Sequence, residues 1–206
     1  MGGLLMTCIP TVVMLAVSSP TAEPPSPQRF ALVIGYNHTL IPNTPSLRYA
    51  DDDALTTHAM LEEAGVESVL LVAPDADTRR LYLRINDGPG SLSQWPSPTL
   101  TNVRGAMASL SRQMQQARRR GERVEFLFFY SGHGGVQHGQ GFIELRGNRF
   151  MRQHLYEEVL ARAPAHQHHV IVDACKSYYL VFGKGAGGSR SRISIPFVNR
   201  AGADRF

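Results

Sequence analysis

The chain alternates between two spacings of hydrophobic residues. Two segments, residues 46–64 and 101–121, carry apolar residues at intervals of three or four, which predicts helices that end at Gly65 and Gly121. Four other runs are almost continuously apolar, as expected of strands buried on both faces of a sheet: residues 29–36, 66–73, 123–130 and 168–174. This alternation predicts an α/β fold in which helices cover both faces of a parallel sheet.

Smaller elements are predicted between these runs. Thr101 is a candidate N-cap for the second helix. Residues 74–98 are polar and contain Pro, Asp and Gly, which predicts a long loop with a short paired strand at residues 81–85. Residues 141–150 alternate between apolar and polar positions and indicate a hairpin, and residues 152–163 are predicted to form a helix.

Composition narrows the class of protein. A length of 206 residues suits one domain of ordinary size, and a hydrophobic content of 43% is enough to fill its core. The net charge of +4 is modest, and no basic stripe with interleaved aromatic residues is present, so we expect no nucleic-acid partner. We interpret the basic run at residues 118–120 as the last turn of a helix, where cations interact favourably with the helix dipole.

The N-terminal segment is expected to lie outside the folded domain. Residues 4–17 are apolar, too short to span a bilayer comfortably, and followed by small residues. This pattern predicts a leader over residues 1–22 and export to the periplasm or the exterior, with no stable membrane span after leader removal. No basic residue precedes Arg29, so a cytoplasmic protein without a leader is the alternative. Residues 23–28 read as a Pro-rich linker, and residues 29–206 as one domain.

Two predicted strands end in residues that are suited to nucleophilic catalysis. One strand leads into a glycine-flanked histidine, His133, and the last strand delivers Cys175, the only cysteine apart from one in the leader. Because parallel sheets gather ligands beyond the carboxyl ends of their strands, both residues are expected at the same edge. A cysteine attacks as its thiolate, and a histidine can pair with that thiolate and protonate a leaving amine. The N–H groups of Gly134 and Cys175 are candidate donors to an oxyanion.

Three blocks carry a family resemblance: "ALVIGYN" followed by "LRYADDDA", then "FFYSGHGG", then "VIVDACKS". In this order they resemble the first strand and helix, the histidine block and the cysteine block of the caspase-like clan of cysteine peptidases, particularly its bacterial and metacaspase-like members. The resemblance implies a caspase-like three-layer sandwich, with a mostly parallel sheet flanked by helices. It also implies a cofactor-free endopeptidase with His133 and Cys175 as its dyad and Gly134 in the oxyanion hole.

The resemblance further implies a peptide or protein substrate that is cut after one charged residue. In metacaspase-like members the pocket for that residue is acidic and takes Arg or Lys, and the matching positions here are Asp53 and Asp173. We interpret Asp51 and Asp52 as acidic residues of a first helical turn, which the helix dipole favours. A preference for Asp at the cleavage site, as in true caspases, would need an arginine, and Arg48 lies nearby in the sequence.

Two departures from the family pattern keep other functions open. Residues 176–178, Lys-Ser-Tyr, follow the cysteine, where family members commonly have His-Ser-Gly or Arg-Gly. Only residues 176–206 remain after Cys175, so we expect the C-terminal strands of the fold to be missing and the chain to be truncated. The alternatives are an inactive caspase-like interaction module, or another cysteine hydrolase such as an amidase.

No metal site is expected. His166, His168 and His169 are close in sequence, but their spacing fits no tetrahedral zinc pattern, and Cys175 has no cysteine partner nearby. A polar segment that leads into a strand accounts for the three histidines.

Overall fold

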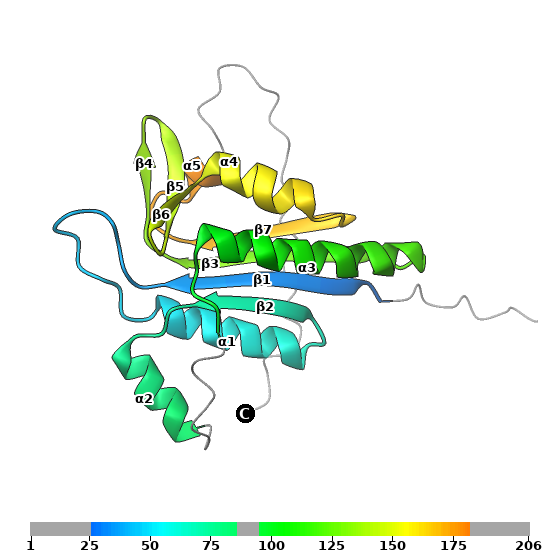
Figure 1. The fold of residues 1–206 in the computed structure, drawn as a ribbon, viewed down its shortest axis with the longest axis horizontal. Coiled ribbons are helices and arrows are strands. Elements are labelled where there is room, and N and C mark those ends of the chain that lie inside the picture. Colours follow the sequence, from blue (N-terminus) through cyan, green and yellow to red (C-terminus); the bar gives the residue numbers. More distant parts are fainter. Residues whose placement is uncertain (1–25, 86–94, 182–206) are drawn as a thin grey trace, which may run out of the picture.

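The computed structural model describes residues 26–85 and 95–181, and its centre is a sheet of parallel strands in the order β2-β1-β3-β7 (Figure 1). Ser131 pairs in register with Gly35 on one side and with Asp173 on the other, so the strands end at a common edge. The strands are β1 (Gln28–Tyr36), β2 (Glu67–Val72), β3 (Val124–Gly132) and β7 (Gln167–Asp173).

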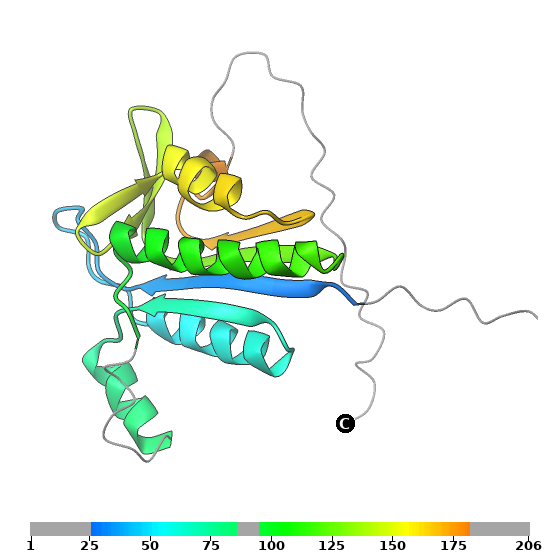
Figure 2. The same cartoon turned by 45° about the vertical axis from the view of Figure 1, so that its right-hand side comes forward.

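Helices cover both faces of this sheet, which confirms the predicted α/β architecture (Figures 1 and 2). Helix α1 (Ala50–Glu63) covers one face at β1 and β2, while α3 (Leu100–Arg119) covers the other. The larger part of the core lies under α3, where apolar side chains leave water almost completely. Its members include Phe30, Leu32, Ile34, Met107, Leu110, Met114, Phe126, Phe128 and Tyr130.

A second, antiparallel sheet stands beyond the carboxyl edge of the first (Figure 1). It contains β4 (Gly134–Gln137), β5 (Gln140–Leu145) and β6 (Asn148–Met151). The hairpin predicted at residues 141–150 is confirmed as β5 and β6. Strand β4 was not predicted, because the glycines that follow His133 have low strand propensity and form a strand only by pairing with β5.

The helix predicted at residues 152–163 is present but irregular. Its first turn is α4 (Arg152–His154), followed by a π-helical turn (Leu155–Val159) and a 3-10 turn (Leu160–Arg162). A short helix that was not predicted, α5 (Tyr178–Val181), contacts β5. It turns the chain back towards the second sheet directly after the predicted cysteine block.

The prediction of a loop with a paired strand was wrong for residues 76–85, which form helix α2 (Ala76–Ile85). Asp75 caps this helix, because its Oδ1 accepts hydrogen bonds from the N–H groups of Asp77 and Thr78, both at 2.9 Å. In the sequence, Leu81, Leu83 and Ile85 alternate with other residues at the period of a strand, which is why the segment was predicted to pair and not to form a helix. Figure 2 shows that α2 lies outside the layers of the sandwich.

Two helices begin at different residues from those predicted. Helix α1 begins at Ala50 and not at Ser46, because the side chain of Asn37 accepts the Ala50 N–H at 2.9 Å and fixes the first turn there. Helix α3 is capped by Thr99 and not by Thr101. The Thr99 Oγ1 accepts the N–H of Asn102 at 3.2 Å.

Some predictions concern residues outside the described ranges. One is the leader at residues 1–22, and the other is the expectation that the C-terminal strands of the fold are missing, which depends on residues after 181. Within residues 26–85 and 95–181, no helix has the length and apolar character that crossing a bilayer requires.

Candidate active site

A glycine closes β3 where the strand approaches its neighbour. Gly132 has a φ of 156°, and a Cβ atom there would lie 2.8 Å from the carbonyl oxygen of Tyr36 and would overlap the hydroxyl of Tyr130. Only glycine fits between these two groups without displacing them. The strand therefore ends tightly packed, and His133 follows immediately.

The register of β3 and β7 brings the two predicted motifs together. Ser131 pairs with Asp173, so the segments that follow leave adjacent strands at the same edge. A Cβ atom added at Gly134 would lie 2.6 Å from the carbonyl oxygen of Cys175 and 3.0 Å from the Cβ of Ala174. The histidine and cysteine blocks are therefore in direct contact, at a point where only a glycine leaves enough room.

His133 is held through its main chain. Its carbonyl oxygen accepts hydrogen bonds from the Glu144 N–H at 3.0 Å and from the Tyr130 hydroxyl at 2.9 Å. Burial raises the pKa of Tyr130, so the phenol remains protonated and able to donate. The Nε2 atom of His133 is buried and has no hydrogen-bond partner within residues 26–85 and 95–181. Within the described residues, the Nε2 side of the imidazole ring is therefore oriented by packing and not by a hydrogen bond.

The N–H of Gly134 points away from the β4–β5 ladder. In an antiparallel ladder, hydrogen-bonded and non-hydrogen-bonded pairs alternate. Because the Glu144 N–H donates to His133, the adjacent pair of Gly134 and Ile143 is of the non-hydrogen-bonded kind. This geometry suits the role of oxyanion donor that the family resemblance implies for Gly134.

Cys175 is exposed in a tight turn at the end of β7. The turn is closed by a hydrogen bond of 3.3 Å from the Ser177 N–H to the Ala174 carbonyl oxygen. Lys176 adopts a left-handed backbone with a φ of 57°, a conformation that costs a non-glycine residue roughly 1–2 kcal/mol. The chain keeps a sharp turn after the cysteine without the glycine that family members commonly place there.

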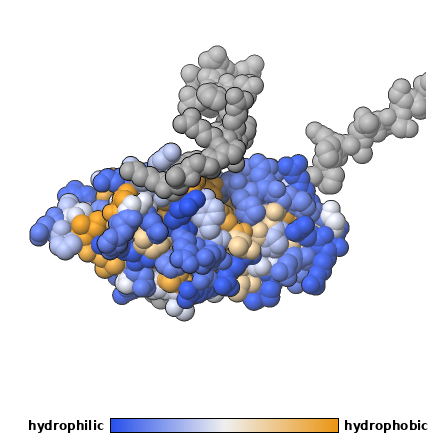
Figure 3. Space-filling view, turned by 90° about the horizontal axis from the view of Figure 1, so that it is seen from above, coloured by the Kyte–Doolittle hydropathy of each residue, from blue (hydrophilic) through white to orange (hydrophobic). Residues whose placement is uncertain are grey.

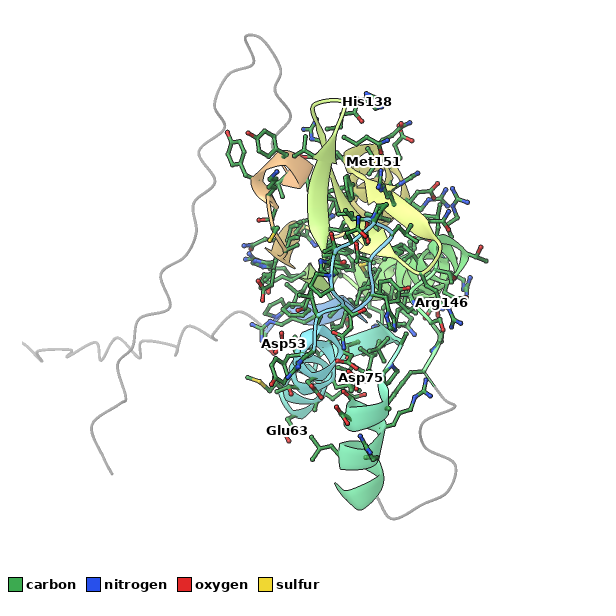
Figure 4. All side chains as sticks on the ribbon, turned by 90° about the vertical axis from the view of Figure 1, so that its left-hand side faces the viewer. Asp53, Glu63, Asp75, His138, Arg146 and Met151 are labelled. Carbon is green, nitrogen blue, oxygen red and sulfur yellow. The ribbon has the colours of Figure 1, made fainter. Side chains whose placement is uncertain are left out.

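Two predicted carboxylates lie on one face of the sheet around Ser131. The Ser131 Oγ donates to the Asp53 Oδ2 at 3.1 Å, so this serine faces α1. Side chains of paired residues on parallel strands share a face, so Asp173 lies on the α1 face as well. Asp53 lies in the first turn of α1, and Figure 4, viewed towards the carboxyl edge of the sheet, shows it beside this helix. Both carboxylates are exposed and accessible to a cation.

Hydrogen bonds among largely buried polar side chains connect the end of β1 with the starts of α1 and α2 near this edge. The Asn37 Nδ2 donates to the Asp51 Oδ1 at 2.7 Å and to the Asp75 Oδ2 at 3.3 Å, and the Asp51 Oδ2 accepts the Asp75 N–H at 2.8 Å. Burial raises the pKa of Asp75, but hydrogen bonds from two N–H groups of α2 and from side chains outweigh this effect and hold it below its ordinary value. The interpretation of Asp51 as a residue that only complements the helix dipole is incomplete, since its side chain is fully buried.

The remaining predicted positions lie elsewhere. Arg48 is exposed in the segment before α1. His166 Nδ1 accepts the Val124 N–H at 2.9 Å, and His168 Nε2 lies 2.9 Å from the Ala163 carbonyl oxygen, so both tie the start of β7 to neighbouring backbone. Among the described residues, no group of three or more metal-ligating side chains converges.

Three residues of this edge were not singled out from the sequence. Ser131 stands in the same block as His133, and that proximity was its only signal. Asn37 directly follows the first strand, where polar residues commonly meet helix N-termini. Asp75 begins a run, Asp-Ala-Asp-Thr, that is typical of a helix cap, but it lies in a segment predicted to be a loop.

Comparison with known protein families gives a match over most of the chain. The sequence profile of the caspase domain family, peptidase C14, matches residues 28–197. The matched range contains all the described strands and both blocks that meet at Gly134. No curated protein matches the chain.

Proposed function

Because the chain belongs to the caspase domain family of cysteine peptidases, we propose that it is an endopeptidase in which His133 and Cys175 act as a dyad. The observation that carries this proposal is the contact at Gly134, whose Cβ would lie 2.6 Å from the Cys175 carbonyl oxygen. It joins the two blocks at the carboxyl edge of the sheet, where α/β folds bind their ligands.

The proposed reaction is acyl transfer through a thioester. The Cys175 thiol gives its proton to His133, and the sulfur then attacks the carbonyl carbon of the scissile peptide bond. The negative charge that develops on the carbonyl oxygen is stabilised by the Gly134 N–H. His133 returns the proton to the amide nitrogen as the C–N bond breaks and the amine leaves. A water molecule, deprotonated by His133, then attacks the thioester and releases the acid and the thiol.

We further propose that the peptide is cut after Arg or Lys. Asp53 and Asp173 lie on the same face around Ser131, and a guanidinium offers a planar set of donors that matches carboxylates. A lysine would bind the same carboxylates as a point charge. Arg48, which a preference for Asp would need, is exposed in the segment before α1.

The proposal is tested with a panel of peptides that differ only in having Arg, Lys, Asp or Ala at the cleavage position. Purified full-length protein is expected to cleave the Arg and Lys peptides, with products identified by mass spectrometry. Cys175→Ala is expected to abolish all cleavage while keeping the circular dichroism spectrum. Cleavage that persists in Cys175→Ala would defeat the assignment of the nucleophile.

A second candidate is an interaction module without peptidase activity. The observation that favours it is the turn after Cys175, where Lys176 holds a left-handed backbone in place of the family's usual residues. In this case no peptide in the panel would be cut, and the reaction of Cys175 with an alkylating reagent would not depend on His133.

A further inference from the structure

One buried acid has no part in the dyad chemistry. Glu144 lies on β5 and is completely buried, with an exposed fraction of 0%. We propose that Glu144 is a positioning residue that fixes the β1–α1 connection, residues 37–49, beside His133, and so shapes the peptide-binding side of the site. This inference deepens the proposed peptidase function and rests on it for its meaning.

The main chain of Glu144 is bound to the histidine block. Its N–H donates to the His133 carbonyl oxygen at 3.0 Å, and its own carbonyl oxygen accepts the Tyr130 hydroxyl at 2.8 Å. The same hydroxyl contacts the His133 carbonyl oxygen. The backbone of Glu144 is therefore fixed relative to His133, and whatever its side chain binds is placed relative to His133 too.

The side chain of Glu144 reaches across to the β1–α1 connection. Its Oε2 accepts the N–H of Leu40 at 2.5 Å, a contact between residues 104 positions apart. The other hydrogen bonds described for residues 38–47 join parts of the connection to each other, such as the 2.8 Å bond from the Leu47 N–H to the Asn37 carbonyl oxygen. Among the hydrogen bonds described for residues 38–47, the bond to the Glu144 carboxylate is therefore the one that joins the connection to the second sheet.

Stability alone does not explain a carboxylate at this position. The second oxygen, Oε1, is buried without a hydrogen-bond partner in the described part of the chain, and Arg149 Nε lies 3.8 Å away. The Arg149 side chain is shared with other groups, since it covers the Phe142 ring at 4.6 Å and donates to Gln137 at 2.8 Å. A buried charge with incomplete pairing destabilises a fold, and apolar replacements at such positions are often neutral or stabilising.

The connection that Glu144 holds carries exposed hydrophobic side chains. Leu40, Leu47 and Tyr49 are 46%, 39% and 67% exposed. Two further exposed hydrophobic residues lie on segments around the same edge, Val136 on β4 and Tyr178 just after Cys175. Figure 3 shows hydrophobic surface interrupting the hydrophilic surface towards the end of the molecule where the connection and second sheet lie. Such side chains suit contact with apolar residues of a bound peptide.

Two substitutions of Glu144 separate its hydrogen bond from its volume. Glu144→Gln keeps an oxygen that accepts the Leu40 N–H, whereas Glu144→Met fills similar space without an acceptor. Leu40→Pro removes the donor and leaves Glu144 intact. Amide hydrogen exchange at Leu40 reports on the link itself. The reactivity of Cys175 is measured with iodoacetamide, which needs no peptide-binding surface, and with a peptidyl chloromethyl ketone that carries Arg next to the reactive group.

The proposal predicts faster exchange at residue 40 in Glu144→Met than in the wild type. The same variant is expected to react with the peptidyl reagent about tenfold more slowly, as expected for losing a hydrogen bond to a charged group, and with iodoacetamide at an unchanged rate. Glu144→Gln is expected to behave like the wild type, and Leu40→Pro like Glu144→Met in its reactivity.

Three outcomes would overturn the inference. They are unchanged exchange at Leu40 in Glu144→Met, an unchanged rate with the peptidyl reagent in both Glu144→Met and Leu40→Pro, and equal slowing of both reagents. Failure of the wild type to cleave any peptide would refute the proposed function separately, because the exchange experiment measures the hold on the connection without any catalysis.

Discussion

The two sides of the candidate dyad are held in different ways. On the histidine side, the backbone of His133 receives hydrogen bonds from Glu144 and from the buried Tyr130. On the cysteine side, Cys175 is exposed in a turn closed by one described hydrogen bond and strained at Lys176. The candidate base is therefore placed by hydrogen bonds from residues of β3 and β5, and the candidate nucleophile by a local turn. Changes that remove a hydrogen bond to the backbone of His133 should therefore affect both stability and reactivity, and changes on the cysteine side mainly reactivity.

The largest effect is expected at the point where the two sides touch. In Gly134→Ala the new Cβ would lie 2.6 Å from the Cys175 carbonyl oxygen, which forces the two blocks apart. We expect peptide cleavage to fall by about 100-fold or more, since displacement of reacting groups by about 1 Å has effects of that size. Steady-state kinetics measure this loss. The matched control is Gly105→Ala on α3, where a Cβ meets nothing within 4 Å and activity should be unchanged. Equal activity in Gly134→Ala and Gly105→Ala would contradict the close contact between Gly134 and Cys175.

The next effect concerns the acidic face. Asp53→Asn and Asp173→Asn each remove one charge that is proposed to bind the substrate cation, and each is expected to lower kcat/KM for Arg peptides about 10-fold to 100-fold. The kcat/KM for a peptide with Ala at that position, if it is cut at all, should change little. Glu63→Gln, at the far end of α1, is the control for charge alone (Figure 4). Identical losses in all three variants would show that the effect is general electrostatics and not a pocket.

A smaller effect is expected on the histidine side. Tyr130→Phe removes the hydroxyl that contacts the carbonyl oxygens of His133 and Glu144. Because it weakens buried hydrogen bonds, we expect the free energy of unfolding to fall by about 1–3 kcal/mol, with slower alkylation of Cys175. Urea denaturation measures the first effect. Tyr49→Phe, at an exposed tyrosine, should change the free energy of unfolding by less than about 0.5 kcal/mol. A Tyr130→Phe protein as stable as that control would contradict the account of how His133 is held.

The smallest effect is expected at His58, which lies away from the candidate site. It tests whether the reactivity of Cys175 depends only on residues of the site. Burial lowers the pKa of His58 from its ordinary value of 6.5, although the nearby Glu62 opposes this shift. As pH decreases below 6.5, the unfolded chain therefore binds a proton before the folded chain does, so stability falls between pH 6.5 and the lower folded pKa and levels off below it. His58→Gln should flatten this part of the stability curve and leave Cys175 alkylation at neutral pH unchanged. If the free energy of unfolding changed with pH at the same slope in the wild type and in His58→Gln, the lowered pKa of His58 would be contradicted.

Much of the fold follows from local patterns. Strand β1 is buried on both faces over most of its length and therefore appears as a continuous apolar run. The expectation of burial on both faces was wrong for the edge strand β7, where no residue is fully buried and Ile171 is 49% exposed. Helix α2 was not predicted because its start depends on the Asp75 cap and because Leu81, Leu83 and Ile85 alternate at the period of a strand. Strand β4 escaped because it begins with glycines whose pairing partner decides their conformation. For β4, propensity fails because pairing with another segment determines the structure.

The residues of the candidate site likewise fall into those that local sequence motifs identify and those that they do not. The histidine and cysteine blocks, and the carboxylates Asp53 and Asp173, were identified because a family resemblance attaches to contiguous motifs. Glu144 was not identified, because the alternating pattern of its segment treats it as an outward-facing polar residue, whereas both faces of β5 are buried. Its link to Leu40 spans 104 positions, and no local pattern encodes such a contact.

The most direct test of the account is the rate at which iodoacetamide alkylates Cys175 with and without His133. The measurement uses full-length protein in which the other cysteine, Cys8, is replaced by Ser, over a range from about pH 6 to pH 9 that spans the ordinary histidine and cysteine pKa values. His138→Ala, at the exposed tip of the β4–β5 hairpin, is the control. If His133 and Cys175 form one site, His133→Ala will react more slowly than both the wild type and the control at neutral pH. Equal rates in all three proteins would contradict it.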